Sequence, residues 1–401
     1  MKRHYTNSFI LNALNLPNIR DLETFSNSIG ISQRLIHLLA NYTPAYYRNF
    51  SIPKKNGTKR EINTPTYSLK LVQRWILKEI LEKIDVSEEA MAFKKGLGNG
   101  IRKNAEIHKY SVYLLQLDIK DFFTSIKKEK VFYLFRDLGY NIVVSNILAN
   151  LCTYKGFLPQ GGVCSPYISN LICYKLDKRL KGLCAKRDIL YTRYADDLTF
   201  SCDNKETLKK VRNIIEDIIK NEGFEINYLK TRFLSPSSHK KITGITVNDN
   251  RIRASKKLKR TVRSMIHHAF VSADYSSKDR IRGYVSFIDS IEEGYKDKVC
   301  KYIDKLANDK NYRYFEDIVV AYNNNKIFKE LADMTFEELS FNDPDDPDDP
   351  EELIIYFISE CVEERYSFLK NRGIKIDFFP DDYGDEVAAE NQDGIAPEDT
   401  F

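Results

Sequence analysis

The chain lacks the features of a membrane or secreted protein. Its 401 residues contain no apolar run near 18 residues, and no basic-then-apolar leader follows Met1. We therefore expect neither membrane insertion nor secretion. The seven cysteines form no Cys-x-x-Cys pair, and the six histidines show no zinc-binding spacing. These absences predict a cytoplasmic protein whose thiols are buried and reduced.

A phosphate-binding loop and internal repeats are also missing. The glycine-rich stretch "GLGNG" at residues 96–100 has no strand-like run before it and no Gly-Lys-Ser/Thr after it, which argues against a nucleotide-binding loop. What remains is ordinary for a globular protein, with 42% hydrophobic and 30% charged residues. The length allows two or three domains.

The net charge of +5 conceals a division of charge along the chain. Residues 330–401 hold 23 acidic and 4 basic residues, whereas residues 1–329 hold 58 basic and 34 acidic ones. A body this basic predicts a polyanionic partner. A tail this acidic indicates a separate module.

The hydrophobic pattern predicts mixed helices and strands. Residues 1–45 and the amphipathic run 68–84 favour helices, and residues 47–66 favour a hairpin around Asn56-Gly57. The run "VYLLQLD" at 112–118 is typical of a strand, and a second hairpin is expected at 240–255 with Asn-Asp-Asn as its turn.

Residues 255–270 predict a basic helix. Ser255 can cap it, one side carries an apolar stripe, and lysines and arginines cover the rest. Such a density of positive charge favours a nucleic-acid face over an ordinary solvated one. Further on, "NDPDDPDDP" at 342–350 predicts a linker, and residues 351–370 predict an amphipathic helix.

Two adjacent carboxylates, Asp196 and Asp197, lie in the otherwise mostly uncharged stretch "YTRYADDLTF" at 191–200. Buried carboxylates need a cation or hydrogen-bond partners. Side chains alternate along a strand, so the pair can face one site only from a hairpin turn. With Asp118 at the end of its own strand, three carboxylates could hold two divalent cations for in-line phosphoryl transfer. An isolated Asp-Asp pair more often caps a helix or lies in a surface turn.

The order of four motifs resolves this ambiguity. The stretches "LDIKDFF", "LPQGGVCSP", "YADD" and "INYLKT" resemble motifs A to D of reverse transcriptases in order and spacing, and the resemblance covers about residues 20–310. It implies an α+β right-hand polymerase fold with fingers, a palm of antiparallel sheet and helices, and a helical thumb. The implied divisions are an N-terminal helical region at 1–48, fingers at 49–115 and 128–190, palm at 116–127 and 191–245, thumb at 246–312, and an acidic C-terminal extension at 313–401.

The same resemblance implies residue roles. Asp118, Asp196, Asp197 and the carbonyl of Ile119 would bind two Mg²⁺ ions, with Mn²⁺ as a substitute, and Lys230 would protonate pyrophosphate unless it is a plain surface lysine. The nucleotide-binding set would be Lys55 (or Lys54 or Lys59 in its place), Arg60, Asp121, Phe122, Phe123 and Gln160, with Phe123 as the gate that rejects a 2′-hydroxyl. Ser165 and Pro166 would start the helix under the template.

Two further stretches resemble retron reverse transcriptases in particular. "NAEIH" at 104–108 matches their Asn-Ala-x-x-His motif, and "ITG" at 242–244 is similar to their Val-Thr-Gly motif with Ile in place of Val. On this reading RNA would be bound by both motifs and by the basic helix, the residues being Asn104, Ala105, His108, Thr243, Gly244, Lys256, Lys259, Arg260 and Arg263. Asn104 and His108 would share one helical face.

The retron resemblance implies an RNA-directed DNA polymerase that binds its own structured noncoding RNA. The enzyme would start from the 2′-hydroxyl of a branch guanosine and make covalently attached single-stranded DNA (msDNA) from dNTPs, in anti-phage defence with an effector protein. The acidic extension would be a docking arm, a nucleic-acid mimic or a solubility tail; its apolar helix favours docking. Rival readings are another bacterial defence or group II intron-like reverse transcriptase, and a catalytically idle RNA-binding scaffold.

Overall fold

The computed structural model describes residues 5–53, 57, 59–94, 100–272, 274 and 276–307, all within a first structural unit that comprises residues 1–356. The predictions for Lys55, the linker 342–350 and the extension 313–401 lie outside the described residues. Within the described part, no helix is both long and apolar enough to cross a membrane. The cysteines described there are all free, and five of the six are buried.

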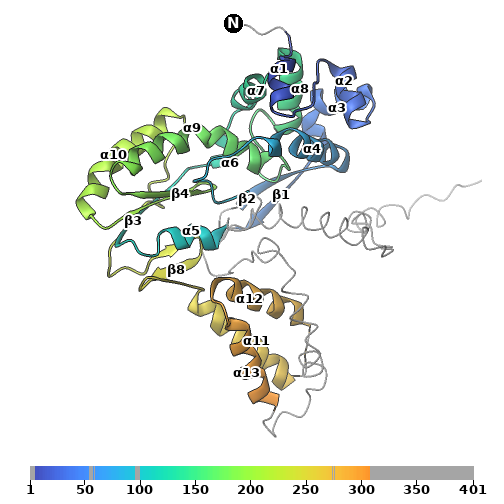
Figure 1. Ribbon diagram of the computed structural model, residues 1–401. Coiled ribbons are helices and arrows are strands. Elements are labelled where there is room, and N and C mark those ends of the chain that lie inside the picture. Colours follow the sequence, from blue (N-terminus) through green and yellow to red (C-terminus); the bar gives the residue numbers. More distant parts are fainter. Residues whose placement is uncertain are drawn as a thin grey trace, which may run out of the picture. The chain divides into compact units, whose positions relative to one another are not determined.

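The N-terminal region is helical, as the sequence predicts, and the expected hairpin follows it (Figure 1). Strands β1 and β2 pair antiparallel from Tyr47↔Pro65 to Pro53↔Lys59. Helix α4 then packs against β2 and α8. The elements of this part are α1 (Ser8–Ala13), α2 (Leu22–Ile29), α3 (Gln33–Asn41), η1 (Thr43–Tyr46), β1 (Tyr47–Pro53), β2 (Lys59–Pro65), α4 (Tyr67–Glu79) and η2 (Leu81–Lys83).

The central feature is an antiparallel four-stranded sheet in the order β4-β5-β3-β6. Strand β3 is mostly buried because helices cover the sheet: α9 and α10 pack on one face and α5 on the other (Figure 1). The elements of this part of the chain are α5 (Ile101–Ile107), β3 (Tyr113–Asp118), α6 (Phe122–Ser125), α7 (Lys128–Asp137), α8 (Ile142–Cys152), α9 (Ser165–Ala185), β4 (Leu190–Tyr194), β5 (Asp197–Cys202), α10 (Lys205–Asn221) and β6 (Arg232–Leu234).

A small three-stranded sheet follows, and here the prediction was incomplete. The expected turn is present at Asp249 and Asn250, both with φ of +56°, but a second tight turn at Thr243-Gly244 adds one more strand. Only two strands were predicted because the stretch before Thr243 is too short to show periodicity. The strands are β7 (Lys241–Ile242), β8 (Ile245–Asn248) and β9 (Arg251–Arg253).

Three helices close the described part: α11 (Lys256–Ser272), α12 (Lys278–Ile291) and α13 (Tyr295–Ala307). They pack on one another through the apolar stripe that includes Val262 and Ile266, which are at most 3% exposed. The predicted cap is confirmed, since Ser255 Oγ accepts from the N–H groups of Lys257 and Leu258. Helix α11 is the predicted basic helix.

Candidate active site

The three carboxylates predicted to act together lie at adjoining ends of two paired strands. Asp118 ends β3 and is the register partner of Asp197, which begins β5. Asp196 lies in the two-residue turn between β4 and β5, and its carbonyl accepts from the N–H of Ile119 at 3.0 Å. The predicted strand, turn and strand around these residues are thus confirmed.

The turn that carries the carboxylates is strained. Ala195 has a φ of +53°, in the left-handed region that residues other than glycine seldom occupy. Such strain persists only where the surroundings enforce it, and it clusters at functional sites.

A fully buried ion pair holds this turn in place. The guanidinium of Arg193 binds Asp177 through Nε at 2.8 Å and Nη2 at 2.7 Å, and both side chains are 0% exposed. Its Nη1 donates to Asn170 and to the carbonyl of Ala195. Tyr191 also donates to Asp177. The sequence analysis missed these residues, although an arginine in the otherwise uncharged strand of the "YTRY" stretch was the available signal.

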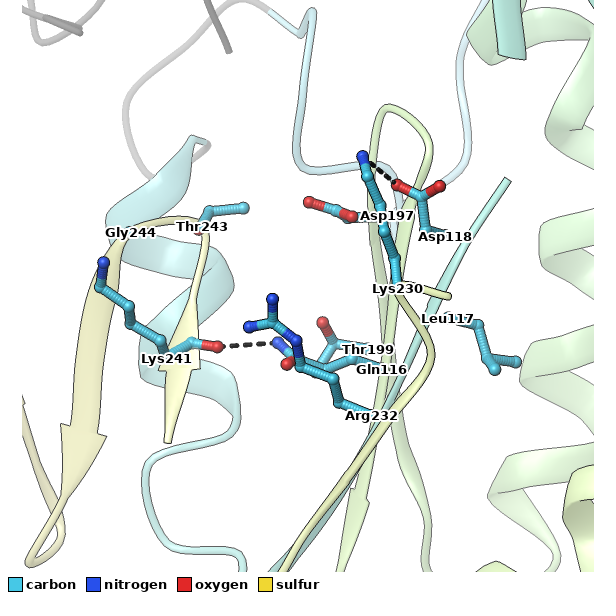
Figure 2. Close-up of a pocket in the computed structure, with 10 residues that line it drawn as sticks. All are labelled: Gln116, Leu117, Asp118, Asp197, Thr199, Lys230, Arg232, Lys241, Thr243 and Gly244. Carbon is cyan, nitrogen blue, oxygen red and sulfur yellow. Dashed lines mark hydrogen bonds and ion pairs between the residues drawn. The ribbon is translucent and has the colours of Figure 1, made fainter. Parts of the chain in front are cut away.

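Lys230 forms an ion pair with Asp118. Its Nζ is 3.1 Å from Asp118 Oδ2. Figure 2 marks this ion pair with a dashed line. Burial lowers the pKa of Lys230, but attraction to the three carboxylates raises it by more, so the net shift is upward. The lysine therefore carries a proton at neutral pH, as a general acid must.

The carboxylates have the chemistry that Mg²⁺ requires, because hard divalent cations take oxygen ligands. Yet no group of three or more acidic, histidine or cysteine side chains is positioned to hold a metal ion in the part of the chain that the structure describes. The ammonium of Lys230 lies beside Asp118 instead. A cation that binds Asp118 would therefore compete with this lysine.

A pocket extends from the carboxylates toward the small sheet. Asp118, Asp197 and Lys230 line it on one side, and Thr243 and Gly244 line it on the other (Figure 2). Gln116, between them, donates to the carbonyl of Lys241 at 2.8 Å. Arg232 and Lys241 also border the pocket. The pocket is therefore polar and basic, which suits a substrate that carries phosphate.

Three of the residues predicted to bind the nucleotide, Asp121, Phe122 and Phe123, follow the end of β3. Asp121 adopts a left-handed φ of +48°, which turns the chain from β3 into the short α6. Phe122 and Phe123 are buried, and Phe123 packs 6.2 Å from the ring centre of Phe93. Arg60 lies half-buried on β2.

The loop with Gln160 is fixed to the β1–β2 hairpin by its backbone. The carbonyl of Gln160 accepts from the N–H of Asn63 at 2.7 Å. Gly161 follows with a φ of +107°, and a Cβ there would lie 3.0 Å from Ile62 Cγ2. Both the conformation and the close approach call for glycine. Ser165 and Pro166 do begin a helix, α9, as predicted.

Of the residues predicted to bind RNA, three are buried. Asn104 is 1% exposed, Ala105 0% and His108 0%, and the two polar side chains bond within the protein. In this conformation neither polar side chain can reach RNA, so the predicted direct contact finds no support here. The shared helical face was identified correctly, but it faces the sheet.

The predicted basic residues of α11 differ in their surroundings. Lys256 and Arg260 are exposed, and Arg263 is exposed with its guanidinium 4.5 Å from the ring centre of Tyr302. Lys259 instead pairs with Glu292, whose carboxylate also accepts from the N–H of Ala254. Lys259 therefore braces the helices, and the other three present positive charge to solvent.

Comparison with known proteins agrees with the geometry. The family described as reverse transcriptase (RNA-dependent DNA polymerase) matches residues 52–247. Fold and site thus define an RNA-directed DNA polymerase. The chain is 37% identical to the Retron Ec86 reverse transcriptase of Escherichia coli, covering 75% of this chain and 94% of that protein. It is 31% identical to the Retron Mx65 reverse transcriptase of Myxococcus xanthus, covering 68% and 69%. The chain belongs to the retron reverse transcriptases.

Among solved structures, the chain is similar to telomerase from Candida albicans in complex with a fragment of telomeric RNA. The two chains are 14% identical, the TM-score is 0.44, and the match covers 88% of this chain and 66% of that one. At this level the likeness carries no argument, and the family assignment rests on the retron relatives.

Proposed function

We propose that this polymerase binds its own structured noncoding RNA, starts from the 2′-hydroxyl of a branch guanosine, and copies part of the RNA into covalently attached single-stranded DNA. The observation that carries the proposal is the placement of Asp118 opposite Asp197, with Asp196 in the connecting turn. Similarity to a retron enzyme over three quarters of the chain supports a structured retron RNA as the template. RNA is recognised by its shape, unpaired loops and 2′-hydroxyls.

The site residues would divide the work as follows. Asp118, Asp196, Asp197 and the carbonyl of Ile119 would hold two Mg²⁺ ions, which when bound activate the attacking hydroxyl and stabilise the leaving pyrophosphate. Lys230 would move from Asp118 to the pyrophosphate and give up its proton there. The backbone N–H groups at the start of α6 and the side chain of Arg60 would hold the triphosphate of the incoming dNTP.

The remaining parts would serve RNA binding and defence. Residues 49–115 and 128–190 would form fingers, 116–127 and 191–245 the palm, and 246–312 a thumb whose α11 tracks the duplex through Lys256 and Arg260. In the cytoplasm, the protein with its RNA and msDNA would restrain an effector protein that acts against phage.

The experiment is to purify the full-length protein from cells that carry the gene with its upstream DNA, and to extract the bound nucleic acid. A short DNA joined to RNA through a bond that a 2′,5′-debranching enzyme cleaves is the expected product. The matched control is the double variant Asp196→Ala, Asp197→Ala, which should yield the RNA without DNA. Identical nucleic acid from both proteins would refute the proposal.

A further inference from the structure

A chain of buried polar groups joins the two stretches that resemble retron motifs. Thr243 accepts from Nδ2 of Asn104 at 3.4 Å, and Oδ1 of Asn104 accepts from Thr192 at 2.5 Å. The imidazole of His108 then lies between Thr192, at 2.7 Å, and Ser201, at 2.6 Å. We call these five residues the polar brace.

The brace is an internal structure and not a ligand site. Four of its members, all but Thr243, are at most 1% exposed. The hydroxyl of Thr192 gives its proton to Asn104, so it accepts from Nε2 of His108. On the other side of the ring, Nδ1 faces the hydroxyl of Ser201 at 2.6 Å, and that hydroxyl also bonds Ser111 at 2.9 Å. Every ring nitrogen and the amide of Asn104 thus has a partner, as a stable buried network requires.

The brace connects to the strands and to the turn that border the active site. Thr192 lies on β4, four residues before Asp196, and Ser201 lies on β5, four residues after Asp197. The far end is the Thr243-Gly244 turn, which borders the same pocket as Asp118 and Asp197 (Figure 2). A primer hydroxyl placed at the aspartates therefore faces this turn.

The turn needs something to hold it. Thr243 has a φ of +44°, and a β-branched residue in the left-handed region is strained. Gly244 has a φ of +81°, so the two residues form a turn with both centres left-handed. The bond from Asn104 to the Thr243 hydroxyl acts on the strained residue itself.

We propose that Asn104 and His108 are positioning residues, which fix the Thr243-Gly244 turn relative to the catalytic strands so that the primer end is held for reaction. The proposal rests on the polymerase activity and not on the identity of the RNA. On this proposal, substitution of these motif residues lowers the rate of DNA synthesis. If they contacted RNA directly, substitution would instead lower the affinity for RNA.

The test uses Thr192→Val and Asn104→Ala in the full chain. Thr192→Val removes the central hydroxyl while it nearly keeps the side-chain volume, and Thr192, at 1% exposed, cannot touch RNA. The matched control is Asn141→Ala. Asn141 is also a buried asparagine; it caps α8 by accepting from the N–H of Val144, and it donates to Thr6 and to the carbonyl of Arg20 in the N-terminal region.

Three quantities are measured for each protein: kcat for extension of oligo(dT) on poly(rA), Kd for that duplex, and the amount of RNA that copurifies from cells. For both brace variants we expect kcat to fall roughly 10- to 100-fold, because small misplacements of reactants cost that much. Kd and copurified RNA should stay within about two-fold of wild type, a threshold well below the ten-fold change that 1.4 kcal/mol produces. Asn141→Ala should lose thermal stability but keep its kcat.

Two results would overturn the proposal. One is a loss of duplex affinity or copurified RNA with kcat retained, which would assign the motif to RNA contact. The other is an equal fall of kcat in Asn141→Ala, which would reduce the effect to general destabilisation. A wild-type protein that fails to extend the primer would refute the polymerase activity itself, which these two results leave intact.

Discussion

Replacing Asp177 by alanine tests the ion pair that supports the catalytic turn. The change strands the guanidinium of Arg193, which is 0% exposed and has two of its nitrogens on that carboxylate. Removing one partner of a buried pair destabilises a protein by about 3–5 kcal/mol. The hydroxyl of Tyr191 also loses its acceptor, which adds about 1 kcal/mol. Urea unfolding should therefore show a loss of about 4–6 kcal/mol.

The control and the double replacement make this prediction sharper. Asp279→Ala breaks the pair with Arg282, whose carboxylate partner is 77% exposed, and should cost under about 0.5 kcal/mol. Asp177→Leu with Arg193→Met should regain most of the stability, because apolar side chains can replace a buried pair. It should not regain primer extension, because the carbonyl of Ala195 has lost its donor. A loss below about 1 kcal/mol for Asp177→Ala would refute the reasoning.

Three further predictions follow from single residues. Burial lowers the pKa of His108 from 6.5 to about 3. Between these two pH values only the unfolded chain binds a proton at His108, so the free energy of unfolding falls as pH falls, by up to about 1.4 kcal/mol per pH unit. Urea unfolding of His108→Gln should therefore show a shallower dependence on acid pH, and an unchanged dependence would contradict this. Gly161→Ala should raise the KM for dNTP and lower the Tm, because it adds backbone strain at a φ of +107°. Its control is Gly182→Ala on α9, where no atom lies within 4 Å of the new Cβ; this change should leave the KM unchanged and stabilise the protein by about 0.5–1 kcal/mol. Lys230→Met should bind Mn²⁺ more tightly in an electron paramagnetic resonance titration, because the competing ammonium 3.1 Å from Asp118 is gone, and equal affinity would speak against that competition.

The strand, turn and strand around Asp196 and Asp197 could be predicted well from the sequence because their constraints are local. Side chains alternate along a strand, so two adjacent carboxylates directed to one site require a turn between strands. The apolar run before Asp118 likewise announced a buried strand. The hairpin of β1 and β2 was equally readable from Asn56-Gly57. Where a fold rests on short-range periodicity, the chain itself contains the information.

The supporting structure was not predictable in this way because its partners are distant. Asp177 and Arg193 are 16 residues apart on a helix and a strand, and nothing local joins them. The direction of α5 was the harder case: the spacing of Asn104 and His108 identified a shared face, but spacing cannot tell whether a polar face meets solvent or a sheet. The hydroxyls of Thr192 and Ser201 decide this.

The two buried networks explain why the strands of this site carry so many polar residues. Strand β4 presents Arg193 to Asp177 and Thr192 to Asn104, on successive residues and hence on opposite faces of the sheet. Apolar side chains on both faces of β4 would pack against α9 and α5 as well. They would not fix the position of either helix along the strand, because hydrophobic contact is non-directional. Hydrogen bonds are directional, so the turn with Asp196 is fixed from both faces at once. On the proposed function, Asp118 exchanges the ammonium of Lys230 for a cation, and this exchange requires that the paired backbone of β3 and β5 stays in place.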